Sequence, residues 1–248
     1  MGKEIEIVEK ESIDWKNPKV FIGFPDVGLV GTIATFHLVH KLKLREFAYM
    51  DSKLFPPVVI VHRSRLSSPI RFYTDEKNSI VVIISEMPIP PAIVYDISEV
   101  LIEWLKNIRP EIVVILGGLI HPQRLELEKP EIYSLASNDK THNLLKNSGT
   151  LLLEEGLLSG PNSILLKYCS RYGLDAIYLM VEAHPHYPDP ESAAIIIEKL
   201  NFMFGFNVDT KELIEKGEEI KIKSKELMRK TQENLRSLQR SDAFMMYR

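Results

Sequence analysis

Ile112-Val113-Val114-Ile115-Leu116-Gly117-Gly118 is the stretch of sequence that most strongly defines the fold of this chain. Its first five residues are apolar, and four of them are β-branched. A short, continuously apolar run of this kind favours a strand that is buried on both faces. Such strands are typical of parallel sheets with helices on both sides, so residues 112–116 predict a central strand of an α/β domain.

Other apolar runs of strand length lie on both sides of this stretch, and segments with helical periodicity separate them. Residues 91–108 form one such helical segment, which ends at Arg109 because a residue before proline is disfavoured in the helical region. Further strands are predicted at residues 20–24, 58–62, 70–74, 80–85 and 176–181, and further helices at 28–42, 138–146, 161–172 and 190–204. The helix at 190–204 is expected to bury Ala193, Ala194, Ile197, Leu200, Phe202 and Phe204.

The alternation of these elements predicts the architecture. It favours an α/β fold with a mainly parallel sheet flanked by helices, to which the strands at 70–85 add an antiparallel part. Residues 1–208 are expected to form this α/β domain, followed by a charged helical extension.

Composition excludes several classes of protein. The 248 residues include 31 Lys+Arg and 34 Asp+Glu, for a net charge of -3, whereas non-specific nucleic-acid binding needs a clustered excess of cations. The single cysteine, Cys169, cannot form an intramolecular disulfide and fits a reducing compartment. The N-terminal residues are too charged for a signal peptide, and no apolar run approaches the roughly 20 residues of a membrane helix. We therefore expect a soluble, cytoplasmic protein that binds neither nucleic acid nor membrane.

The amide content points to the habitat of the source organism. Lys and Glu are abundant, while glutamine occurs only at Gln123, Gln232 and Gln239. This pattern is typical of hyperthermophile proteins, so a thermophilic source is predicted. A melting temperature in the ordinary mesophile range would contradict that prediction.

A glycine-rich turn follows the first predicted strand, with the sequence Gly23-Phe24-Pro25-Asp26-Val27-Gly28-Leu29-Val30-Gly31. Such a turn can present backbone N–H groups and a helix N-terminus to an anion. Its glycine spacing, G-x4-G-x2-G, differs from the dinucleotide fingerprint, and the Lys-Ser/Thr of a phosphate-binding loop is missing. Asp26 would also repel phosphate. Close backbone packing is the favoured interpretation, and ligand binding is the alternative.

A second candidate is Glu182-Ala183-His184-Pro185-His186-Tyr187-Pro188-Asp189-Pro190, which follows a predicted central strand. Open α/β sheets bind ligands at the carboxyl ends of their strands. His184 and His186 could bind zinc with Glu182 or Asp189 as an oxygen ligand, but no third ligand lies at a recognisable spacing. The three prolines favour a rigid connector, with Asp189 as N-cap and Pro190 at the first position of the next helix.

The remaining reactive side chains form no recognisable catalytic motif. His37 and His40 lie three residues apart on a predicted helix, and His62, His121 and His142 are scattered. There is no G-x-S-x-G sequence, and Cys169 lies in a predicted helix, where a small core residue is expected. We therefore predict no catalytic residue, no metal site and no cofactor.

Residues 209–240 differ in composition from the preceding domain. They hold nine Lys/Arg, seven Asp/Glu and no proline, and Leu213, Ile220 and Leu227 are seven residues apart. This pattern predicts a charged helical spacer, which either folds back on the domain or projects from it and self-associates. Gly217 weakens the continuity of such a helix by about 1 kcal/mol relative to alanine.

Residues 241–248 end the sequence with Phe244, Met245 and Met246 before Tyr247. A frayed terminus is normally polar, and an exposed apolar stretch at a free end needs a partner. A free carboxylate and a tyrosine are both suited to peptide capture. The tail is therefore predicted to dock on a partner, the alternative being that it packs on its own domain.

Four segments marked by glycine or proline, in this order and spacing, resemble the proteasome assembly chaperone family in its archaeal form. They are residues 23–31, Gly117-Gly118, residues 156–162, and residues 182–191 with Ser192-Ala193-Ala194. The resemblance spans residues 18–215. It implies an α/β fold similar to the phosphorylase/hydrolase-like sheet of nucleoside phosphorylases, without their catalytic residues.

The end of the chain is similar to the hydrophobic-tyrosine-any ending with which proteasome activators and assembly chaperones dock on the 20S core particle. The resemblance implies that Met246 is the apolar anchor, that Tyr247 is the recognition residue, and that the Arg248 carboxylate pairs with a lysine in a pocket between α-subunits. The expected function is a proteasome-binding chaperone or ATP-independent activator, not an enzyme. A three-residue anchor binds weakly alone, so several tails in a homo-oligomer, with a tetramer as the expected size, would bind by effective concentration.

A nucleoside- or phosphate-binding enzyme on the same fold is the alternative. It predicts small-molecule binding near Gly28 or His184, and stabilisation of the protein by nucleosides or phosphate would reveal such a site.

Overall fold

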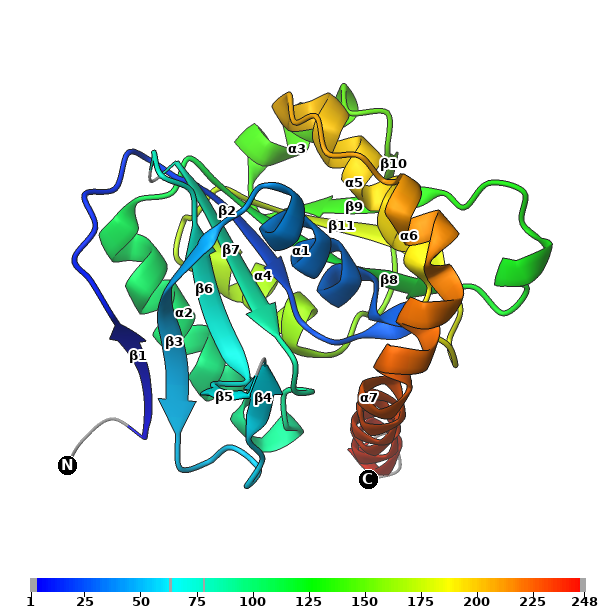
Figure 1. The fold of residues 1–248 in the computed structure, drawn as a ribbon. Coiled ribbons are helices and arrows are strands. Elements are labelled where there is room, and N and C mark those ends of the chain that lie inside the picture. Colours follow the sequence, from blue (N-terminus) through cyan, green and yellow to red (C-terminus); the bar gives the residue numbers. More distant parts are fainter. Residues whose placement is uncertain (1–3, 63, 78, 246–248) are drawn as a thin grey trace.

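A computed structural model describes residues 4–62, 64–77 and 79–245 (Figure 1). Its strands are β1 Ile5–Glu9, β2 Lys19–Gly23, β3 Arg45–Ser52, β4 Ile60–His62, β5 Arg65–Ser67, β6 Ile70–Thr74, β7 Ile80–Ser85, β8 Ile112–Ile120, β9 Ile132–Ala136, β10 Leu151–Leu152 and β11 Ala176–Ala183. Its helices are α1 Val30–Lys41, α2 Val94–Ile108, α3 Asp139–Lys146, α4 Pro161–Arg171, α5 Pro190–Phe204, α6 Lys211–Glu215 and α7 Gly217–Met245, with the 3-10 turns η1 Val27–Leu29, η2 Pro91–Ile93 and η3 Arg124–Glu126.

Nine strands form one sheet in the order β1-β3-β6-β7-β2-β8-β11-β9-β10, and β4 pairs with β5 in a separate hairpin. The centre of the sheet, β7-β2-β8-β11, is parallel. On one side β1, β3 and β6 continue it in antiparallel pairing, and on the other β9 runs antiparallel to β11. The predicted α/β fold with flanking helices is confirmed, but the antiparallel part is larger than expected.

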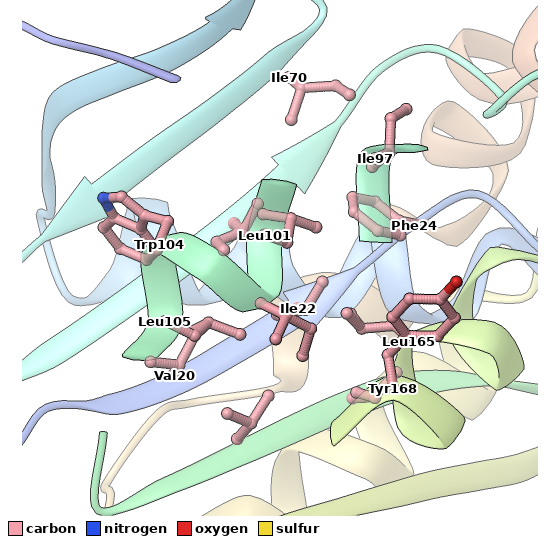
Figure 2. Close-up of a cluster of buried hydrophobic side chains, with 14 of the residues drawn as sticks. Val20, Ile22, Phe24, Ile70, Ile97, Leu101, Trp104, Leu105, Leu165 and Tyr168 are labelled. Atoms are coloured by element: carbon pink, nitrogen blue, oxygen red, sulfur yellow. The ribbon is translucent and has the colours of Figure 1, made fainter. Parts of the chain in front are cut away.

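The central strands bury both of their faces, because successive side chains of a strand point in opposite directions. Val20 and Ile22 of β2 join one hydrophobic cluster, and Phe21 between them joins the other. Helices α2 and α4 cover the first face, where their residues Leu101, Trp104 and Leu165 belong to the same cluster as Val20 and Ile22 (Figure 2). Helices α1 and α5 cover the opposite face. This arrangement explains why the central strands are apolar throughout.

Local sequence fixes several helix ends. Asn138 caps α3 by accepting a hydrogen bond from Thr141 N–H at 3.0 Å, in a capping box. Asp189 caps α5 by accepting from Ser192 N–H at 3.0 Å, and Pro190 opens the helix as predicted. Gly205 then ends α5 in the left-handed region, with a φ of 70°.

Two predictions about the elements were wrong. Strand β8 does not end at Leu116 but continues through Gly117 and Gly118 to Ile120. Phe202 of α5 was expected to be buried and is 73% exposed, because it lies on the face of the helix that points away from Ala193 and Ile197.

The segment after Asp209 forms two helices, α6 and α7, which break at Lys216–Gly217. Leu213 and Met228 from these helices are buried in the same cluster as α1 and α5. Among the described residues, no helix is both long and apolar enough to span a bilayer.

Candidate functional site

The glycine-rich turn between β2 and α1 brings backbone segments into direct contact. A Cβ atom on Gly23 would lie 2.1 Å from the carbonyl oxygen of Gly31, and one on Gly31 would lie 2.1 Å from that of Leu116. Gly28 has a φ of 63°, which favours glycine. The turn therefore uses its glycines to pack β2, α1 and β8 together, which agrees with the structural interpretation of this motif.

Asp26 turns inward from this loop and is buried at the carboxyl ends of the central strands. Its Oδ2 accepts hydrogen bonds from Asn162 Nδ2 at 2.9 Å, Tyr178 Oη at 3.2 Å and Gly118 N–H at 3.3 Å. Gly117 is required beside it, because a Cβ there would lie 2.1 Å from Asp26 Oδ2. The glycine pair inside β8 thus makes room for a carboxyl group.

Burial controls the protonation of this group. Loss of solvent raises the pKa of Asp26 to about 8, against the opposing effect of its three hydrogen-bond donors. Asp26 is therefore a largely neutral acid at neutral pH. Because it is enclosed by β8, β11 and α4, its carboxyl group is not exposed to an anion outside the turn.

The connector between β11 and α5 is held by a buried arginine. The Nε of Arg124, a residue of η3, lies 3.0 Å from Asp189 Oδ2 and donates a hydrogen bond to Ser192 Oγ at 3.0 Å. Its Nη2 lies 3.3 Å from Glu191 Oε2. Asp189 also accepts from the backbone N–H of His184 at 3.3 Å. These contacts hold the segment in place, which agrees with its interpretation as a rigid connector. The role of Arg124 in holding it was not predicted.

The two histidines of the connector lie close together but do not form a metal site with a third ligand. Their rings are 5.9 Å apart, and His184 Nδ1 accepts from the backbone N–H of His186 at 3.0 Å. Burial lowers the pKa of His184. Within the described part of the chain, no group of three or more His, Cys, Asp or Glu side chains could hold a metal ion.

Cys169 is buried in α4, as predicted. Burial raises the pKa of its thiol to about 12, which keeps it protonated. A thiolate is the nucleophilic form of cysteine, so this residue is unsuited to nucleophilic catalysis.

The C-terminal helices pack on the domain through one face. Helix α6 is tied to α1, since Lys41 lies 2.7 Å from Glu212 and His37 Nε2 lies 2.7 Å from the Asp209 carbonyl oxygen. The hydrogen bond from Lys41, together with that from Lys216, lowers the pKa of Glu212 to about 2. A groove of about 570 Å³ remains between α1, α6 and α7.

Helix α7 then continues past the domain. Over residues 217–234 most of its side chains are exposed or half-buried, and Met228 and Thr231 are buried. Gln232 donates to the Pro185 carbonyl at 3.2 Å and Asn234 to the Ile89 carbonyl at 3.5 Å. The helix runs on to Met245, toward the chain end marked in Figure 1. The predicted docking residues Met246, Tyr247 and Arg248 lie outside the described residues.

The sequence analysis did not single out Asn162, Tyr178 or Arg124. Asn162 follows Gly160-Pro161, a helix-start signal, so its position could be predicted, but its partner is 136 residues away in the sequence. Nothing local marks Tyr178 or Arg124 as partners of buried carboxyl groups.

The family of the chain follows from its comparison with known proteins. The profile of the PAC2 family matches residues 20–228. The chain therefore belongs to the PAC2 family. A protein of Methanocaldococcus jannaschii, MJ0106, which is described as uncharacterized, is 30% identical over 227 residues, 92% of each chain.

Solved structures agree with this assignment. The crystal structure of Pyrococcus furiosus PbaA, described as an archaeal homolog of proteasome-assembly chaperone, is 29% identical, with a TM-score of 0.85 over 92% of this chain and 98% of that one. Pyrococcus furiosus PbaB, described as an archaeal proteasome activator, shares the fold at 22% identity, with a TM-score of 0.74 over 92% of this chain and 99% of that one. These likenesses do not favour the alternative of a nucleoside- or phosphate-using enzyme.

Proposed function

We propose that this protein is a proteasome-binding assembly chaperone or ATP-independent activator, and not an enzyme. The observation that carries the proposal is the similarity to PbaA, at 29% identity over 92% of the chain. The closed Asp26 cluster and the protonated thiol of Cys169 support a non-catalytic role. As part of the same proposal, the sheet is similar to that of nucleoside phosphorylases. The protein is also proposed to be cytoplasmic and to come from a thermophilic archaeon.

The proposed contact is made by Met246, Tyr247 and Arg248, which dock into pockets between α-subunits of the 20S core particle. Helix α7 supports this proposal because it leads toward these residues as a continuous helix. Its 29 residues make a rod about 44 Å long at a rise of 1.5 Å per residue. The buried contacts of Met228 and Thr231 fix the direction of the rod, and roughly 17 Å of it lies beyond Asn234.

Helix α7 therefore acts as a stiff spacer in the proposed function, together with the rest of residues 209–240. A stiff spacer reduces the ordering cost of presenting a short tail to a pocket. Because one tail binds weakly, we propose that several copies, with a tetramer as the expected assembly, present their tails together to the α-subunit ring.

The test compares the full chain with a chain that lacks Met246 to Arg248. Loss of co-elution with archaeal 20S particles, with an unchanged circular dichroism spectrum, is the expected result. A full-length Lys225→Glu variant is the control, since Lys225 is exposed on α7 far from the tail, and it should still co-elute. Unchanged co-elution of the shortened chain would refute the docking proposal.

Peptide hydrolysis by the same particles separates the two forms of the function. Stimulation of hydrolysis by the full chain identifies a gate-opening activator. Co-elution without stimulation identifies an assembly chaperone.

A further inference from the structure

The groove of about 570 Å³ between α1, α6 and α7 also borders the β4–β5 hairpin through Ile60. All four elements contribute to its apolar lining, which consists of Ile33, Phe36, Ile60, Leu213, Ile220 and Leu227. Binding sites in proteins are typically concave, mostly apolar and of this order of volume. The groove is therefore large enough to receive a few apolar side chains of a partner.

The carboxylates along this groove differ in how closely they are paired. Glu86 pairs with Arg71, and both of these side chains are less than one-fifth exposed. Glu219 is held more loosely, because Lys223 Nζ is 3.8 Å away and the two side chains are 66% and 78% exposed. A segment that fills the groove can therefore bring a cation to Glu219 as well as apolar groups to the floor.

Residues 246–248 of the chain combine these two features. Met246 and Tyr247 supply a flexible apolar side chain and an aromatic ring, and Arg248 supplies the cation. These residues lie outside the described part of the structure. Their distance from the groove is nevertheless limited by the helix that precedes them.

The length of α7 prevents a chain from placing these residues in its own groove. Leu227 is the last residue of α7 that lines the groove, and Met245 lies 18 residues further along the same helix. At a rise of 1.5 Å per residue, that separation is about 27 Å. Arg248 is three residues beyond Met245, and three residues span at most about 11 Å. A groove that binds residues 246–248 must therefore belong to a second copy.

The course of α7 allows two copies to meet in this way. The helix continues for 11 residues beyond Asn234, which contacts the domain through the Ile89 carbonyl (Figure 1). If two α7 helices lie antiparallel, the end of each is beside the beginning of the other, where the groove lies. A two-fold axis then fills both grooves at once, since such an interface is self-complementary.

We propose that the groove between α1, α6 and α7 binds Met246 and Tyr247 of a second copy, with Arg248 paired to Glu219. The two copies thus exchange residues 246–248. This inference goes beyond the proposed function, because it assigns a binding site on the α/β domain and requires no proteasome. Where the same residues also dock on the 20S core particle, as proposed above, the two contacts compete for them.

Peptide binding tests the groove directly. A fluorescein-labelled peptide of residues 241–248 should bind the full chain, measured by fluorescence anisotropy with Tyr247→Ala in the protein so that its own residues compete less. Ser224 lines the groove, so Ser224→Phe should fill it and weaken binding by about tenfold or more. Lys225→Phe is the matched control, because it adds the same ring on the exposed side of α7 and should leave binding unchanged.

Charge reversal tests the ionic contact in the same assay. Glu219→Lys in the protein and Arg248→Glu in the peptide should each weaken binding by about fivefold or more, since like charges then meet. The two changes together should restore binding to within about threefold of the original pair. Glu226→Lys makes the same charge change at an exposed position of α7 that does not line the groove, and it should have no effect.

Disulfide formation identifies which copy supplies the segment. A mixture of full chains with Ser224→Cys and with Tyr247→Cys should form a disulfide-linked heterodimer, whereas Lys225→Cys in place of Ser224→Cys should not. Cys169 is buried and does not compete. A chain that carries both Ser224→Cys and Tyr247→Cys should link to a second copy and not to itself, because its own segment cannot reach.

Circular dichroism checks that each variant is folded, and Glu219→Lys keeps the test available if Ser224→Phe is not. Three results would overturn the proposal: a peptide that does not bind, binding that the groove variants leave unchanged, or a disulfide within one chain. If the neutral dye N-phenyl-1-naphthylamine binds in the groove and the peptide does not displace it, a small apolar ligand fills the groove instead, which also overturns the proposal.

The groove and the 20S docking proposal can fail separately. Ser224→Phe leaves residues 246–248 unchanged and should co-elute with 20S particles at least as well as the wild type, whereas deletion of Met246 to Arg248 should abolish co-elution. Weaker co-elution of folded Ser224→Phe would contradict the competition between the two contacts. Peptide binding to the groove is measured without proteasome, so it stands even if the full chain does not co-elute.

Discussion

Asn162 Nδ2 donates a hydrogen bond to Asp26 Oδ2 across 2.9 Å, and this contact ties the start of α4 to the glycine-rich turn. The other oxygens of the two side chains, Asp26 Oδ1 and Asn162 Oδ1, are buried acceptors without a hydrogen-bond donor. Two unpaired buried acceptors in one cluster are costly. If Asp26 is protonated on Oδ1, that atom becomes a hydrogen-bond donor. It can then donate to Asn162 Oδ1, and the carboxylic acid and the amide form a pair with two hydrogen bonds.

The first prediction is that Asp26 makes the stability of the protein depend on pH. Burial raises its pKa from 3.8 to about 8, so the folded state binds the proton more tightly than the unfolded state. Its contribution is complete below pH 3.8 and decreases as the pH rises toward 8, by up to about 1.4 kcal/mol per pH unit. Besides burial, the groups that act on the pKa of Asp26 within the described part of the chain are Asn162, Gly118 and Tyr178, none of which is a charged side chain.

Asp26→Asn provides the measurement for this prediction. An amide can donate to Asn162 Oδ1 and accept from Asn162 Nδ2, so the variant should fold and should lose this pH dependence. Urea unfolding at about pH 5 and about pH 8 should show that the wild type loses stability relative to the variant. Parallel stability curves for the two proteins would show that Asp26 is ionised in the folded state.

The second prediction concerns the close approach of α1 to β8. Gly31→Ala should destabilise the protein by at least about 2 kcal/mol, because its Cβ would lie 2.1 Å from the Leu116 carbonyl oxygen. Alanine is the better helix former by about 1 kcal/mol, so helix propensity alone predicts the opposite sign. Gly156→Ala is the control, since the nearest atom to its Cβ would be 3.7 Å away. Equal stability of the two variants would contradict the close packing.

The central strands could be predicted from sequence because each is a short run of apolar residues buried on both faces. Strand β3, REFAYMDS, was not predicted, because an outer strand carries charged residues among its apolar ones and lacks such a run. Strand β9, IYSLA, is short and contains a serine whose burial depends on Thr150. The outer strands therefore need tertiary contacts to be recognised.

The buried polar clusters could not be predicted for a similar reason. Asp26 was interpreted as a residue that repels phosphate from the turn, and the structure shows that it points into the protein. Its partners Gly118 and Asn162 are 92 and 136 residues away, and Arg124 is 65 residues from Asp189. No local pattern reports such pairings, whereas the N-cap role of Asp189 is local and was predicted.

The third prediction concerns the ion pair in the connector before α5. Arg124→Met should cost about 3–5 kcal/mol, because it leaves the buried Asp189 carboxylate without its cation. Asp189→Asn removes the charge and keeps a side chain that can cap α5. In the double variant, the cost should be smaller than the sum of the two single costs by at least about 1 kcal/mol. Additive costs in denaturant unfolding would show that the two side chains act independently.

The fourth prediction tests whether α7 is anchored to the α/β domain. Met228 is 2% exposed and belongs to the cluster that α1 and α5 form, so Met228→Ala should destabilise the protein by about 2–5 kcal/mol. Lys225→Ala, three residues earlier on the exposed side of the same helix, should change stability by less than about 0.5 kcal/mol.

A helix that only projected from the domain would tolerate both changes equally, and its amides would exchange with solvent along its whole length. An anchored helix should instead protect the amides up to about Thr231, where the buried contacts are, more strongly than those near Met245, and hydrogen exchange of the full chain measures this difference.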